Sequence, residues 1–240
     1  MPPPHTVRFN GSHRQCCRKP QRIQPRLFAE NGRLLDSQGR ITLDTPEALR
    51  ALENYRETYS YSDRTIYDFW KNALEGFADG TAAMTVVFIN YASHILNSQM
   101  SRIAGKLGFA PVPGGKPLLG GGVIGITQSC TCPAAACKFL EWLYADLVAP
   151  VFTMLGGLSP CRSAYSNRDI SEQYPWLSTA RKSFPTAQRR SNSTYYQNFS
   201  ELQLETILAA HVQQAVLGVC SPEEALKQAQ EDCNRYFQPW

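Results

Sequence analysis

One continuous apolar run constrains the fold of this 240-residue chain more than any other feature. Residues 82–89 read Ala-Ala-Met-Thr-Val-Val-Phe-Ile, which combines apolar and β-branched side chains without a polar alternation. Such a run suits a β-strand that is buried on both of its faces. Strands of that kind belong to sheets whose two faces are covered by helices, so the run predicts an α/β fold.

Two further segments, residues 106–112 and 122–127, also resemble strands, because glycines and prolines bound short apolar runs there. A turn-rich hairpin is predicted over residues 28–42, where Asn31-Gly32 and Gln38-Gly39 punctuate the chain. Apolar residues at helical spacing predict helices at about residues 46–59, 66–78, 133–145, 149–155, 199–217 and from 222 onward. The last helix has the clearest start, since Ser221, Pro222 and Glu224 form a capping box.

The charge of the chain is concentrated at its beginning. Residues 1–26 hold six Arg or Lys and no acid, which leaves 18 of the 24 basic residues against 20 acidic ones. The rest is therefore near neutral and lacks the basic face that a nucleic-acid-binding protein needs. We predict that residues 1–26 form a basic, disordered leader without the apolar stretch of a secretion signal.

Catalytic signatures for the common hydrolases, metalloproteases, phosphate-binding loops and dinucleotide sites are all missing from the sequence. His94 and His211 stand among apolar residues and are predicted to be structural. The glycines at 114–115 and 120–122 are predicted to serve turns or a hinge, because no helix start follows either run. The sequence therefore predicts that the chain is not an enzyme and uses no cofactor or metal.

Aromatic residues stand where predicted elements end, and amides stand beside them. A pyranose ring offers C–H faces that lie on aromatic rings and hydroxyl groups that bind amides or carboxylates. Asn192, Asn198 and Glu201 could supply further polar groups. We predict that a small solute, most simply a sugar, contacts Phe88, Asn90, Tyr91, Tyr195, Tyr196 and Phe199.

Several motifs, taken in order, resemble the second half of the family 1 extracellular solute-binding proteins, the group of maltose-binding and related sugar-binding subunits. The resemblance runs from about Phe28 to the end of the chain. No single motif decides it, but their order and spacing do. The matching stretches are residues 31–36, 45–48, 77–84, 108–115, 121–126 and 221–227.

The resemblance implies a periplasmic-binding-protein-like fold of type II, in which two α/β lobes close on a solute. It implies a carboxy-terminal lobe formed by residues 27–118 and 164–240, and a partial amino-terminal lobe to which residues 119–163 belong. It further implies the permease subunits of an ABC transporter as partners and a place in the periplasm or on the extracellular face of the membrane. No signal peptide is recognised in this chain.

The resemblance also implies that much of the first lobe is missing. The helix at 133–145 would then lack the strands on which it packs, and Phe139, Leu140 and Leu143 should form an exposed apolar patch. We expect poor solubility or association with another chain, and weak solute binding.

Three alternatives stay open at this point. The solute could be a glycerol phosphate or another small polar molecule, because loops set solute class. Eight cysteines permit a metal or redox function, for which Cys130, Cys132 and Cys137 are the candidates. The chain could also be a non-functional fragment with a foreign leader.

Overall fold

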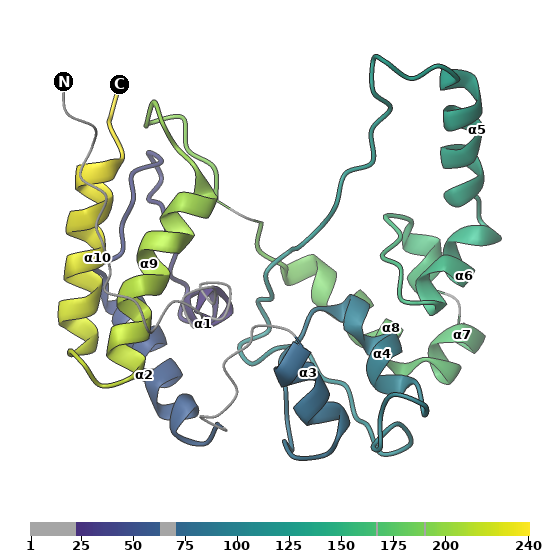
Figure 1. Cartoon of the computed structure of the whole chain (residues 1–240), viewed down its shortest axis with the longest axis horizontal. Helices are drawn as coiled ribbons and strands as arrows, with labels where there is room; N and C mark the ends of the chain where they lie inside the picture. The colour runs from purple at the N-terminus through teal and green to yellow at the C-terminus, as the bar shows by residue number, and fades with distance from the viewer. Residues whose placement is uncertain (1–22, 63–70, 167, 190) are drawn as a thin grey trace. The chain divides into compact units, whose positions relative to one another are not determined.

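The computed structural model describes residues 23–62, 71–166, 168–189 and 191–240. The chain divides into two compact units: unit 1 combines Met1–Trp70 with Ser191–Trp240, and unit 2 is Lys71–Arg190 (Figure 1). The predicted leader lies outside the described residues up to position 22. Its last residues are ordered, however, because Ile23 and Gln24 are buried in unit 1.

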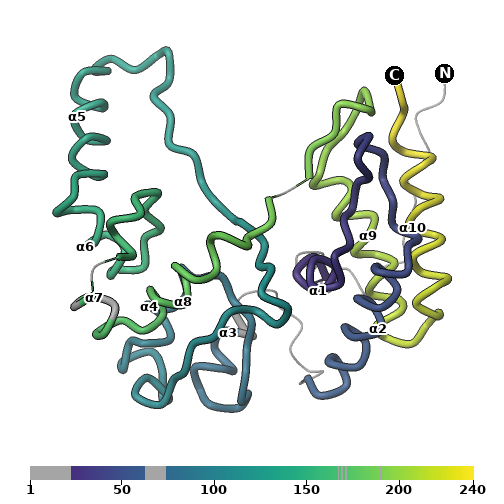
Figure 2. The backbone as a smooth tube through the Cα atoms, turned by 180° about the vertical axis from the view of Figure 1, so that it is seen from behind, coloured from purple at the N-terminus to yellow at the C-terminus, as the bar shows by residue number. Residues whose placement is uncertain are grey.

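Unit 1 is built from four helices whose segments come from both ends of the chain. α9 and α10 lie side by side (Figures 1 and 2), α2 packs against both of them, and α1 packs on α2. The first and last thirds of the sequence therefore share one body. The helices are α1 (Gln24–Ala29), α2 (Pro46–Ser60), α9 (Glu201–Val216) and α10 (Pro222–Tyr236).

Local sequence signals set where three of these helices begin. The Thr45 side chain accepts a hydrogen bond from the backbone N–H of Ala48 at the start of α2. At α10 the predicted capping box forms: Ser221 Oγ accepts from the N–H of Glu224, and the Glu224 carboxylate accepts from the N–H of Ser221. These bonds satisfy amides that have no partner within the helix.

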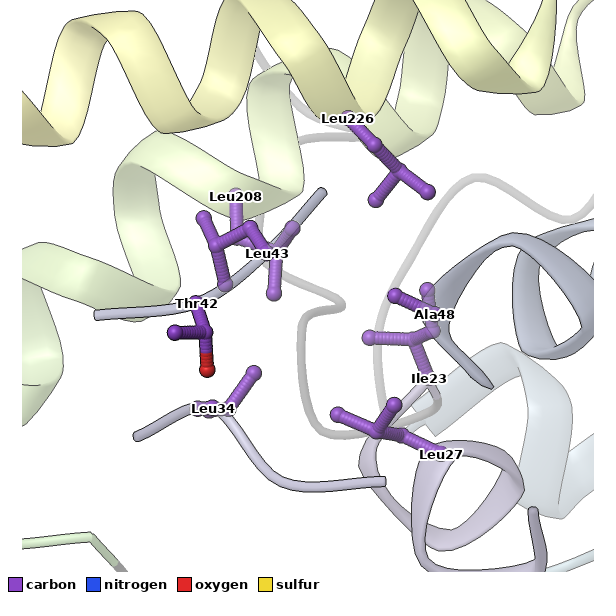
Figure 3. A pocket seen from close by; sticks show the side chains of 8 residues that line it. All are labelled: Ile23, Leu27, Leu34, Thr42, Leu43, Ala48, Leu208 and Leu226. Atoms are coloured by element: carbon purple, nitrogen blue, oxygen red, sulfur yellow. The ribbon is translucent and has the colours of Figure 1, made fainter. Parts of the chain in front are cut away.

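The core of unit 1 is apolar and closely packed. Leu52 and Leu204 are fully buried, and they share the cluster with small residues that let α2, α9 and α10 approach, among them Ala51, Ala215 and Ala229. One cavity of about 10 Å³ remains, lined by the eight residues of Figure 3. It has room for about one water molecule, so it cannot hold a sugar.

A short hairpin joins α1 to α2, close to the predicted position. Leu35 and Ile41 form an antiparallel bridge, and Asp36 Oδ1 accepts hydrogen bonds from the backbone N–H groups of Gln38 and Arg40. The Gln230 side chain of α10 holds the returning arm: its Nε2 donates to the carbonyl of Ile41, and its Oε1 accepts from the backbone N–H of Leu43.

Unit 2 contains shorter helices joined by long irregular segments (Figure 1). None of the helices in the described part of the chain is long and apolar enough to cross a membrane. The α-helices are α3 (Lys71–Ala78), α4 (Ala92–Leu96), α5 (Pro133–Leu143), α6 (Val148–Met154), α7 (Arg168–Gln173) and α8 (Pro175–Ser183), and the 3-10 turns are η2 (Ile89–Tyr91), η3 (Arg162–Tyr165) and η4 (Phe184–Thr186).

Two small cores hold unit 2 together. The larger centres on Trp176 and Leu177 of α8, which meet Ala149 of α6 and Tyr165 of η3. The Tyr165 hydroxyl donates to the carbonyl of Ser159, which satisfies its polar end. The smaller core joins α3 to α4 through Leu74, Ala78 and Ile95.

The three predicted strands do not form hydrogen-bonded ladders, and this is a correction. Within the described residues the only β pairing consists of three isolated bridges. Residues 82–88 are irregular, and Met84 and Val86 are 88% and 62% exposed, so this run is not buried on both faces. A strand is buried in that way only between neighbouring strands, and the described residues supply none to it.

The predicted apolar patch on α5 is confirmed in part. Phe139 is 55% exposed, but Leu143 is only 8% exposed because the end of α5 meets α6, so its assignment to the patch is wrong. Leu140 is half-buried. Trp142, which the sequence did not single out, is 56% exposed and takes the place of Leu143 in the patch.

We expect Leu52→Ala to lower the free energy of unfolding of unit 1 by about 2–5 kcal/mol, because it leaves a hole where α2 meets α9 and α10. Leu202→Ala, in the 71% exposed side chain of α9, is the matched control and should change it by less than about 0.5 kcal/mol. Urea unfolding followed by circular dichroism measures both. Equal effects would contradict the packing described above.

Candidate functional site

The first group of predicted site residues lies at the turn η2 in unit 2. The backbone N–H of Tyr91 donates to the carbonyl of Phe88, which closes the turn at 3.0 Å. Tyr91 packs against the smaller core and Ile89 against the larger one. These contacts fix the turn on two sides and leave the Asn90 side chain exposed to solvent.

Two glycines allow other segments to approach this turn closely. A Cβ atom at Gly156 would lie 2.3 Å from Ser93 Oγ, and Gly156 also has a φ of +93°, so a side chain there would be strained twice over. A Cβ at Gly120 would lie 3.5 Å from the Phe88 ring. Sequence reasoning missed Ser93 and Gly156, although the Gly156-Gly157 pair after α6 was a visible signal.

The second group, Tyr195, Tyr196 and Phe199, lies in unit 1 just before α9. Tyr196 is 9% exposed and belongs to the core, and its hydroxyl accepts a hydrogen bond of 3.0 Å from the backbone N–H of Ile41. Phe199 stacks on Tyr196 with ring centroids 6.4 Å apart. Tyr195 meets Tyr196 edge to face at 4.9 Å and stays half-exposed.

Arg40 is a neighbour of Tyr195 that the sequence did not indicate. Its guanidinium carbon lies 5.3 Å from the centre of the Tyr195 ring, within the range of a cation–aromatic contact. Ser193 ties the two segments together, because its hydroxyl donates to the carbonyl of Gly39 and accepts from the N–H of Tyr195. The turn at Gly39 had been predicted, but its contact with residue 195 depends on tertiary structure.

The end of the chain fixes the same segment from the other side. The backbone N–H of Gln197 donates to the carbonyl of Gln238, and the N–H of Trp240 donates to the carbonyl of Tyr195. Asn198 spends its amide on this pairing, since Nδ2 donates to the carbonyl of Tyr236 and Oδ1 accepts from the N–H of Gln238. Asn198 therefore supports the segment instead of offering a free amide.

The structure thus brings each trio of predicted residues together within its own unit. Asn90 and Tyr91 carry the exposed amide and the half-exposed ring of unit 2, and Tyr195 carries the half-exposed ring of unit 1. Tyr196 and Phe199 mainly form the support of Tyr195. Glu201 also has a positioning role, because its Oε1 accepts a 2.8 Å hydrogen bond from the N–H of Ser191.

The cysteines show no sign of a built reactive site. Among the described residues no group of three His, Cys, Asp or Glu could hold a metal ion, and Cys130, Cys132 and Cys137 form no such group. All six described cysteines are free thiols. Burial, followed by the charge of the neighbouring Asp232, raises the pKa of the Cys233 thiol to about 12, which makes Cys233 unreactive.

His211 lies in a structural pair, as predicted. Its Nε2 lies 2.8 Å from Asp232 Oδ2, which joins α9 to α10, and Arg235 also contacts this carboxylate. Because the His211 side chain is only 11% exposed, it has no room to meet a substrate. His94 is half-buried in α4.

Residues 23–179 match a family described as bacterial extracellular solute-binding protein, which is more than half of the chain. Solved structures resemble the chain as well. Maltose-bound MalE3 of T. maritima matches with a TM-score of 0.74 and 22% identity, over 89% of this chain and 56% of that one.

Two further solved solute-binding proteins of ABC transporters have similar statistics. The protein of Agrobacterium radiobacter K84 in complex with ribitol has a TM-score of 0.70 and 21% identity, over 91% of this chain and 56% of its own. The protein of Thermotoga lettingae TMO bound with α-D-tagatose has a TM-score of 0.68 and 25% identity, over 90% and 56%. The chain therefore spans a little more than half the length of the structures it matches.

The predicted fold class, periplasmic-binding-protein-like, is confirmed by this likeness. The likeness covers about nine-tenths of this chain, even though its strand segments are unpaired. Both facts have one explanation: residues 82–88 and 121–127 follow the path of the shared fold without the strands that would complete a ladder.

We expect Tyr196→Phe to lower the free energy of unfolding by about 1–3 kcal/mol, because the buried N–H of Ile41 loses its acceptor. Tyr236→Phe is the matched control, since Tyr236 is 46% exposed, and its cost should be below about 0.5 kcal/mol. Chemical unfolding measures both. A Tyr196→Phe protein as stable as the wild type would show that this hydroxyl is not a structural anchor.

A thiol reagent at about pH 8 should label Cys132 and Cys137 quickly in the folded protein and Cys233 only after unfolding. The first two are exposed, whereas Cys233 is buried and its pKa is raised to about 12. Mass spectrometry of peptides from a labelling time course measures the rates. Labelling of Cys233 as fast as that of Cys137 would contradict the packing between α9 and α10.

Proposed function

Because this chain belongs to the bacterial extracellular solute-binding proteins, we propose that it binds a carbohydrate or polyol for uptake through an ABC transporter. The observation that carries the proposal is the family match over residues 23–179. The bound molecules of three structural neighbours, maltose, ribitol and tagatose, support the solute class. The family is one of solute-binding proteins, so the proposed activity is binding and not catalysis.

In this proposal the turn η2 supplies the polar contact and one ring. Asn90 offers an exposed amide that can both donate to and accept from sugar hydroxyl groups, and Tyr91 stands beside it. The turn is held by two cores and by close contact with Gly156, so its amide needs little ordering when solute binds.

Tyr195 supplies the second ring in the proposal. Its half-exposed face can cover the C–H face of a pyranose, and Arg40 beside it can donate to hydroxyl oxygens. Tyr196 and Phe199 hold this ring in place from the core. Solute would then be enclosed when residues of unit 1 and unit 2 contact it together, as in lobe closure.

The lobe boundaries predicted above, 27–118 with 164–240 and 119–163, remain part of the proposal, as do permease subunits as partners and a periplasmic or extracellular location. A second proposal, glycerol phosphate as solute, is tested in the same experiment.

We expect maltose, ribitol or D-tagatose to shift the NMR signals of the Asn90 side chain and of the Tyr91 and Tyr195 rings. Binding should be weak, because the chain corresponds to 56% of the matched proteins, and NMR detects weak binding. Asn90→Ala should raise Kd about tenfold, which corresponds to about 1.4 kcal/mol for the lost hydrogen bonds.

Gln99→Ala is the matched control, since Gln99 is an exposed amide of the same unit and should leave Kd unchanged. Shifts caused by glycerol 3-phosphate alone would replace the carbohydrate with a phosphate ester. If no titrant changed any signal of a folded sample up to its solubility limit, the proposed function would be refuted.

A further inference from the structure

An outstretched segment of unit 2 leaves its backbone unpaired. Residues 121–127 have no helix or turn and run as a long trace to α5 (Figures 1 and 2). Leu119 is the last residue before it with a backbone partner, and Thr127 the first after it. Between them no backbone N–H or C=O group bonds to another described residue, so the segment has the open edge of a strand.

The same segment carries exposed apolar, β-branched side chains. Val123 is 98% exposed, Ile124 56% and Ile126 38%. Proteins usually protect such edges with Lys, Pro or inward-pointing charges. Here no charged residue occurs anywhere from Pro117 to Cys137, and no proline occurs between Pro117 and Pro133. Nothing in the sequence therefore opposes pairing with another strand.

The exposed rings of α5 continue this apolar surface in the chain. The Phe139 and Trp142 rings lie 5.8 Å apart, each more than half exposed. Lys138 and Glu141 stand next to them and are exposed. If α5 packs antiparallel on a copy of itself about its middle, Lys138 lies opposite Glu141 of the copy, so the charges of this helix are complementary to themselves.

We propose that a second copy of this chain docks on the surface formed by residues 121–127 and α5. The strand edge pairs antiparallel with the same edge of the copy, and Phe139 and Trp142 are buried beside it. An open edge and a helix with self-complementary charges both fit a twofold axis, which makes the contact closed and the assembly a dimer. The inference is independent of the proposed solute, since it uses neither Asn90 nor Tyr195.

Sedimentation of the purified 240-residue chain tests the proposal, with a concentration-dependent dimer as the expected result. Ile124→Lys should raise the dimer dissociation constant at least about tenfold, because a charge enters the paired edge. Val219→Lys is the matched control: Val219 is 73% exposed, lies in unit 1, and should leave the dimer unchanged.

Charge reversal on α5 tests the twofold arrangement itself. Lys138→Glu alone should weaken the dimer, and the double variant Lys138→Glu with Glu141→Lys should restore it, because each lysine again faces a glutamate. Hydrogen exchange should show residues 121–127 protected only at concentrations where the dimer forms. Solute titration of the same variants shows whether binding, a separate property, is intact.

Other occupants of this surface would give different results. A chain that sediments as a monomer at every concentration overturns the proposal. Protection of residues 121–127 in that monomer would show that the chain covers its own edge. A complex formed only on addition of the part of T. maritima MalE3 that this chain does not match would identify a partner of another sequence. Open-ended oligomers would exclude the twofold contact.

Discussion

The packing of α2 against α9 and α10 is the constraint on which the rest of unit 1 depends. It joins segments about 150 residues apart, and the loss of chain freedom in doing so must be offset by apolar burial. Leu52, Leu204 and Leu226 provide this burial, and alanines on all three helices allow the close approach. With these helices fixed, the hairpin and the segment around Tyr195 are fixed as well.

Polar contacts then convert a packed core into a positioned surface. Gln230 of α10 holds both Ile41 and Leu43, and Tyr196 reaches the same hairpin arm from the other side. Each of these bonds satisfies a backbone group that burial would otherwise leave unpaired. Tyr195 inherits its position from them, together with Ser193 and the pairing with Trp240. The half-exposed ring is thus the outer end of a network that begins in the core.

Unit 2 divides its residues differently. Its two small cores lie around α8 and between α3 and α4, and they support the turn that carries Asn90. The segment from 121 to 127 and the exposed side of α5 belong to neither core. Apolar surface of this extent usually serves an interface. One unit thus carries both a candidate polar contact for solute and a candidate surface for a second chain.

Local signals in the sequence determined most of the secondary structure of unit 1. Thr45 with Pro46, and Ser221 with Pro222 and Glu224, predicted two helix starts correctly, because a cap depends only on residues within one turn. The Asn31 and Gly39 turns were likewise visible, and both residues adopt positive φ. Family motifs spread along the chain predicted the shared fold, which the solved structures confirm.

Tertiary structure alone decided which residues are buried and which surfaces remain open. The apolar run at 82–89 carries the composition of a central strand, but a strand becomes central only when neighbours bond to both of its edges, and the described residues provide none. In the same way, sequence could mark Tyr195, Tyr196 and Phe199 as aromatic residues before a helix. It could not separate the ring that faces solvent from the two that support it, because that depends on Ile41 and Phe237, which are distant in sequence and adjacent only in the folded chain.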